Sequence, residues 1–108
     1  MVIIESSIFT NQISDLLDDE DYSVFQEYLC KHPNSGDIIP GTGGLRKIRC
    51  ALPGRGKKGS ARIIYYWFDN KNQIYMLFAY PKNKQVDLTP QQKNILMQYI
   101  KEELKGEK

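Results

Sequence analysis

Three segments rich in β-branched and aromatic residues lie close together in the second half of the chain, and their short connections constrain the fold most. Leu45 to Leu52 alternates apolar with basic residues, Ala61 to Asp69 reads ARIIYYWFD, and Gln73 to Tyr80 reads QIYMLFAY. Such composition is typical of strands. The connections are too short for crossover helices, so we predict an antiparallel meander.

Helical patterns flank this meander. Phe9, Ile13 and Leu17 share one face of a predicted helix over residues 8–17 that Ser6 or Ser7 caps, and a second helix is predicted over residues 19–31. Thr89 is the expected N-cap of a closing helix, with Pro90 at its first position and Gln92 completing a capping box. The apolar residues 1–5 predict an N-terminal strand joined to the sheet. The class is therefore α+β, in one domain over residues 1–108.

Charge is distributed very unevenly along the chain. The formal net charge is only +2, yet residues 41–84 hold ten Lys or Arg and one acid, Asp69, for +9, whereas residues 1–40 sum to −7. The acids at residues 18–21 are expected in the first turn of the second helix, where the helix dipole favours them. Basic residues gathered on a sheet predict a polyanionic partner. The sequence shows no signal peptide and no apolar run long enough to span a membrane, so we expect a cytoplasmic protein without a membrane partner.

The glycine-rich segment from Gly54 to Gly59 formally matches G-x-G-x-x-G. It lies between two predicted strands, which excludes a dinucleotide-binding turn, because that turn must open a helix. Two interpretations stay open: a hairpin loop, or a cationic finger that uses Arg55, Lys57 and Lys58 to contact phosphates.

The alternation of the first basic strand places Lys47 and Arg49 on one face and Arg46 on the other. Arg62 begins the next strand. These cations are either a solvated sheet face or a site that stabilises an anionic transition state. RNA cleavage through the 2′-OH needs a base, an acid and cations around the phosphorane, but no metal or cofactor. We place Arg49 and Arg62 on the phosphate, because arginine cannot deprotonate, and Lys47 or Lys82 in proton transfer.

Other residues of the basic region are candidates for binding RNA without taking part in the chemistry. Tyr66 and Tyr80 are the aromatic residues that we expect to be exposed near the cations, where they would stack on bases. The predicted RNA-binding residues are Arg46, Arg55, Lys57, Lys58, Tyr66, Tyr80, Asn83 and Lys84.

The motif GTGGLRKIR, followed by the Gly/Lys-rich loop and RIIYY, resembles the HigB-type branch of the RelE toxin superfamily. The resemblance covers residues 36–88 closely, and the flanking helices match in length and order. It implies a RelE-like fold and a ribosome-dependent endoribonuclease that cuts mRNA in the 30S A site and so inhibits translation. It also implies inhibition by a cognate antitoxin, often one with a helix-turn-helix domain, through which the complex would reach operator DNA.

By position, the basic residues of this family fall on Lys47, Arg49, Arg62 and Lys82, with Asn83 beside the last. Many RelE members carry a tyrosine where this chain has Leu88, and the histidines of another HigB group are missing from this sheet. The general acid and general base therefore stay unassigned. The alternative function is a non-catalytic RNA- or ribosome-binding module with the same basic surface.

Overall fold

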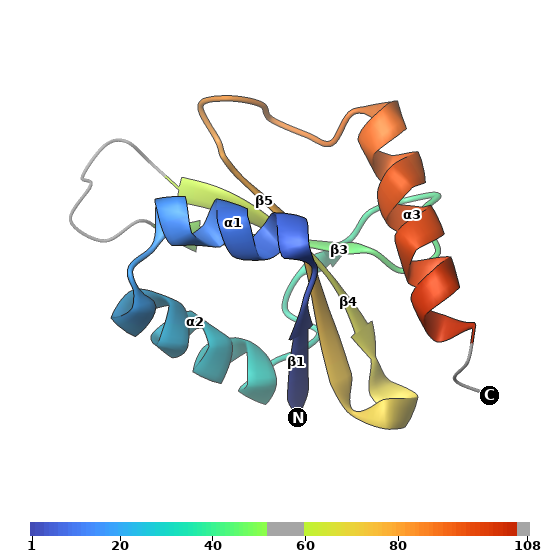
Figure 1. The fold of residues 1–108 in the computed structure, drawn as a ribbon, viewed down its shortest axis with the longest axis horizontal. Coiled ribbons are helices and arrows are strands. Elements are labelled where there is room, and N and C mark those ends of the chain that lie inside the picture. Colours follow the sequence, from blue (N-terminus) through green and yellow to red (C-terminus); the bar gives the residue numbers. More distant parts are fainter. Residues whose placement is uncertain (52–59, 106–108) are drawn as a thin grey trace.

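The computed structural model describes residues 1–51 and 60–105, which form a five-stranded sheet between two layers of helices (Figure 1). The strand order is β1-β5-β4-β3-β2. The strands are β1 (Val2–Glu5), β2 (Asp37–Ile38), β3 (Arg46–Ala51), β4 (Ser60–Phe68) and β5 (Gln73–Pro81), and the helices are α1 (Ser7–Leu16), α2 (Asp19–Lys31) and α3 (Pro90–Leu104).

The three central strands are the antiparallel meander that the sequence predicted. β4 pairs with β3 on one side and with β5 on the other, both in antiparallel register. A register shift at Ile64/Tyr65 places one extra residue in β5. The turn between β4 and β5 ends at Asn72, whose φ of 55° is tolerated because asparagine accepts the left-handed region more readily than most residues.

The two edge strands complete a mixed sheet. β1 joins the sheet as expected and runs parallel to β5. β2 was not predicted, since it is only two residues long and pairs with Arg46 and Lys47. The segment that leads into β2 is held by a residue of β4. The Tyr65 hydroxyl donates to the Pro33 carbonyl (2.7 Å) and accepts from the Gly36 N–H (2.9 Å).

α1 and α3 begin after the caps that the sequence predicted, and the Ser6 side chain accepts from Phe9 N–H. Asp18 was expected in the first turn of α2 but is its N-cap, and the acidic residues 19–21 form that turn. Thr89 and Gln92 form the full capping box of α3 with Pro90 in its first turn. α2 has the predicted bounds, and α1 begins one residue earlier and ends one residue earlier than predicted.

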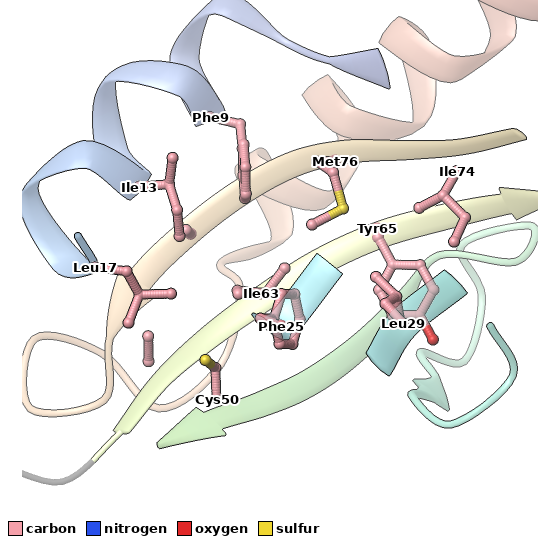
Figure 2. Packing of buried hydrophobic residues seen from close by; sticks show 12 residues of the cluster. Phe9, Ile13, Leu17, Phe25, Leu29, Cys50, Ile63, Tyr65, Ile74 and Met76 are labelled. Atoms are coloured by element: carbon pink, nitrogen blue, oxygen red, sulfur yellow. The ribbon is translucent and has the colours of Figure 1, made fainter. Parts of the chain in front are cut away.

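Each face of the sheet has its own core. α1 and α2 pack on one face, where Phe9, Ile13, Phe25 and Leu29 point toward the sheet around Ile63, Tyr65, Ile74 and Met76 (Figure 2). α3 packs on the other face, where Leu96 and Ile100 meet Leu45, Ile64, Tyr75 and Leu77. α3 covers only part of its face, and the end of the sheet where β4 begins and β5 ends carries the cations discussed below.

The loop that enters β3 has the unusual backbone expected of GTGG. Gly44 has φ 118°, and a Cβ there would lie 3.0 Å from the Tyr66 ring, so glycine serves both the conformation and the close approach. Among the described residues, no helix is long and apolar enough to cross a membrane.

Candidate functional site

Arg49, Arg62 and Tyr80 form a row across three neighbouring strands. Arg49 on β3 is the register partner of Arg62 on β4, and Arg62 is the partner of Tyr80 on β5. Directly opposite residues of antiparallel strands have Cβ atoms about 4.5–5.5 Å apart and share a face. The sheet thus brings together two of the predicted catalytic residues, which lie 13 positions apart in the chain.

The two arginines of this row are available for an anionic ligand. The Arg49 side chain is exposed and Arg62 is half-buried. Arg62 Nη1 donates to Ser60 Oγ (3.1 Å), a neutral oxygen. In the part of the chain that the structure describes, neither arginine is ion-paired with a carboxylate. Two guanidinium groups side by side, with neither in direct contact with a carboxylate of the described residues, are a suitable receptor for a phosphate.

Lys47 lies on the same face, opposite Ile64 and two residues before Arg49. Its Nζ lies 2.5 Å from Asp87 Oδ1, in an ion pair whose side chains are 31% and 66% exposed. The hydrogen bond and charge of Lys47 hold the pKa of the Asp87 carboxyl below its ordinary value, against some desolvation, and Lys93 and Arg62 lower this pKa further. An acid therefore lies among the cations of the predicted basic face.

Asp87 and Lys93 were not among the predicted site residues. Asp87 lies in the connection between β5 and α3, 40 positions from its partner Lys47, and Lys93 lies in the first part of α3. No local pattern marks either residue, because both reach the site through the packing of α3 on the sheet. Asp87 could be recognised from the sequence only if the contact between its segment and β3 were already known.

Tyr80 is at the end of the row, but it is not exposed as predicted. Its side chain is only 4% accessible and belongs to the core under α3. Its hydroxyl donates weakly to the Val86 carbonyl (3.4 Å). Burial and then Asp87 raise the pKa of this phenol, with Arg62 opposing them. It can donate a proton but offers little aromatic face for stacking.

Lys82, Asn83 and Lys84 are exposed at the same end of the sheet. The Lys82 N–H donates to the Ser60 carbonyl (3.0 Å), which extends the pairing of β4 and β5 past Pro81. Lys82 thus follows the row directly at the end of β5. Lys84 turns toward α1, where it lines a hollow of about 420 Å³ with Gln12 and Asp15.

Two of the predicted RNA-binding residues lie apart from this row. Arg46 points to the α1/α2 side, where its guanidinium donates to the Gly36 carbonyl (2.8 Å) and lies 5.9 Å from the centre of the Trp67 ring. Tyr66 is half-buried and lines a hollow with Met97 and Leu104, under the second half of α3. The remaining predicted contacts, Arg55, Lys57 and Lys58, lie outside the described residues.

A pocket of about 340 Å³ opens beside Lys47. Its charged lining is Lys47, Lys93, Asp37 and Asp87, and its apolar lining is Ile38, Ile39, Pro40 and Leu88. Leu88, which occupies the position of the tyrosine of many RelE members, is 6% exposed and packs into the core under α3. Among the described residues, no group of three or more His, Cys, Asp or Glu side chains is placed to hold a metal ion.

The fold and this site together define a small α+β protein whose sheet presents paired guanidinium groups at one end. The family model for the RelE toxin of the RelE/RelB toxin–antitoxin system matches residues 34–107. The chain therefore belongs to the RelE toxin family. The match includes every strand except β1, and it leaves α1 and α2 outside.

Proposed function

We propose that this chain is a HigB-type toxin and acts as a ribosome-dependent endoribonuclease that cleaves translated mRNA. The observation that carries the proposal is the row formed by Arg49, Arg62 and Tyr80, with Lys47 and Lys82 on either side of it. Family membership supports the toxin role and a cognate antitoxin as partner. The ribosome and mRNA as targets place the action in the cytoplasm.

The chemistry is a transfer of the scissile phosphate within the RNA. A base removes the 2′-OH proton, the 2′-oxygen attacks phosphorus, and the bond from phosphorus to the 5′-oxygen breaks. The 5′-oxygen takes a proton from an acid, and the products carry a 2′,3′-cyclic phosphate and a 5′-OH. Arg49 and Arg62 would stabilise the charge of the phosphorane through donors that are already in place.

Three side chains are candidates for the two proton transfers. Lys82 is exposed at the end of β5, and Lys47 is held by Asp87. Tyr80 carries a phenol proton and lies beside Arg62 in the row, so it is a candidate donor to the 5′-oxygen. The site then needs no histidine and no bound metal for this reaction.

Arg62→Ala tests the proposal directly. We expect the variant to lose growth inhibition on induction and to produce no new mRNA 5′ ends in transcript mapping, because removing a donor to the phosphorane costs about 10²–10³ in rate. Arg62→Lys keeps the charge but loses the fork of donors, so we expect an intermediate activity. Lys31→Ala, which removes an exposed cation at the end of α2, is the matched control and should cleave like wild type. Full cleavage by a folded Arg62→Ala variant would reject the site.

One observation favours the alternative, a non-catalytic RNA- or ribosome-binding module. The Lys47 ammonium is ion-paired with Asp87, which leaves a surface able to bind phosphates without an assigned base. That function predicts inhibited translation with intact transcripts. The same mapping of 5′ ends therefore separates the two functions.

A further inference from the structure

One cation contacts the Asp87 carboxylate, and the charges of two others, from different elements, act on it. Lys47 comes from β3 and makes the 2.5 Å contact, Arg62 comes from β4, and Lys93 comes from α3. Lys47, Asp87 and Lys93 line the same pocket of about 340 Å³. The Asp87 side chain is 66% exposed, so it can leave without disturbing the core.

A carboxylate in this position is bound by the same groups as a phosphate oxygen. Both carry negative charge and accept hydrogen bonds from ammonium and guanidinium groups. An exposed ion pair is weak, because water solvates both partners and two side chains must be held in one geometry. An incoming phosphodiester, with two accepting oxygens and its own neighbouring phosphates, can therefore exchange with it.

We propose that Lys47 and Lys93 form a subsite for a phosphate of single-stranded RNA, and that Asp87 occupies this subsite in the free chain. The inference rests on the proposed function, because it takes RNA as the ligand. It assigns a role to Lys93 and makes Asp87 a competitor that RNA displaces. The subsite lies next to the row of Arg49, Arg62 and Tyr80, where a phosphate neighbouring the scissile one would reach it.

The pocket contains a matched control for this idea. Asp37 is the other carboxylate of the lining, and it is exposed at the start of β2. The structure shows no ion pair for it within the residues described. Asp37→Asn and Asp87→Asn therefore change net charge equally and preserve side-chain size, but only Asp87→Asn frees Lys47.

The test is the binding of a 2′-O-methyl RNA tetranucleotide, whose blocked 2′-oxygen prevents cleavage, to the full chain at about 0.15 M salt. At this ionic strength charges farther apart than about 8 Å are largely screened. The NMR signals of the lysine side chains show whether the RNA is bound and which lysines it contacts. We expect Asp87→Asn to tighten binding about twofold to fivefold relative to Asp37→Asn. We expect the Lys47 and Lys93 signals to shift on titration, and Lys93→Gln to weaken binding more than Lys101→Gln on the same helix.

Equal affinities of Asp87→Asn and Asp37→Asn, or Lys93 signals that do not shift, would overturn the subsite. No ribosome and no cleavage enter this measurement. A chain that binds as expected but produces no new mRNA ends would keep the subsite and lose the endoribonuclease proposal. If the chain cleaves mRNA but Asp87→Asn and Asp37→Asn bind RNA equally, the endoribonuclease proposal stands and the subsite is rejected.

Discussion

At the scale of single residues, the site combines two permanently charged guanidinium groups with one buried tyrosine hydroxyl. Arg49 and Arg62 cannot lose their charge at physiological pH, so their contribution to chemistry is limited to binding and stabilising an anion. Tyr80 differs in that its ring is buried while its hydroxyl lies close enough to Asp87 and Arg62 for both charges to act on its pKa. Burial thus leaves the ring unavailable for stacking on a base, and only its hydroxyl is a candidate for the chemistry.

Tyr80→Phe separates these two properties. The phenyl ring should keep the packing under α3, so we expect the free energy of unfolding to change by no more than about 1 kcal/mol, since only a long hydrogen bond is lost. If the hydroxyl protonates the leaving 5′-oxygen, cleavage of mRNA on ribosomes should fall by about 10²–10⁴. Urea unfolding and cleavage rates measure the two effects.

Tyr66→Phe is the matched control, because Tyr66 shares the sheet face but lies under the second half of α3. Its cleavage rate should equal that of wild type. A Tyr80→Phe variant with undiminished cleavage would assign the acid elsewhere, with Lys82 as the next candidate.

At the scale of elements, the start of α3 holds the site together. Asp87 and Leu88 immediately precede the Thr89 cap, and Leu88 is buried beside Leu96. Thr89 Oγ1 accepts from Gln92 N–H (3.0 Å), and the Gln92 side chain accepts from Thr89 N–H (2.9 Å). The Gln92 side chain also accepts from Gln85, which ties the connection to the helix.

Thr89→Ala should therefore loosen both the helix start and the placement of Asp87. We expect a loss of about 1 kcal/mol in the free energy of unfolding, within the range of about 0.5–2 kcal/mol for capping residues. Chemical denaturation measures this loss. Gln91→Ala, at an exposed position outside the capping box, is the control and should be within about 0.5 kcal/mol of wild type. Equal stability of the two variants would contradict a structural role for the cap.

At the scale of the whole molecule, acidic and basic residues concentrate on opposite faces of the sheet. The acidic helix α2 and α1 lie over one face of the sheet (Figure 1). Arg49 and Arg62 lie on the other face, which they share with the core under α3. The long-range order of the sheet thus gathers on one face charges that the chain distributes over several strands. An inhibitor that neutralises this face would keep it from the ribosome.

Charge reversal tests this view of the antitoxin. If the cognate antitoxin places acids over the row, Arg49→Glu and Arg62→Glu should each weaken the complex by tenfold or more, measured by calorimetry at about 0.15 M salt, because buried like charges repel. Lys31→Glu, on the acidic side, should bind like wild type. We expect a smaller effect at Lys47, whose charge Asp87 already compensates. Unchanged affinity in both arginine variants would mean that the antitoxin binds elsewhere.

Much of this fold could be predicted because its signals are local. The capping residues Ser6 and Thr89 mark the starts of α1 and α3, and alternation in β3 separates Lys47 and Arg49 from Arg46. By contrast, β2 is too short to have a pattern, and it depends on the Tyr65 hydroxyl binding the backbone around Gly36. The exposure of Tyr80 was predicted wrongly, because strand parity gives the face of a residue and not what covers that face.

The sequence by itself determined the elements of this protein, their order and the cations of its central strands, because period, capping and charge are properties of neighbouring residues. Only the tertiary structure decided which charges meet. Strand register placed Arg49 beside Arg62, and the docking of α3 brought Asp87 and Lys93 to Lys47 and buried Tyr80. Those contacts join residues up to 40 positions apart, and no local pattern specifies such distances in space.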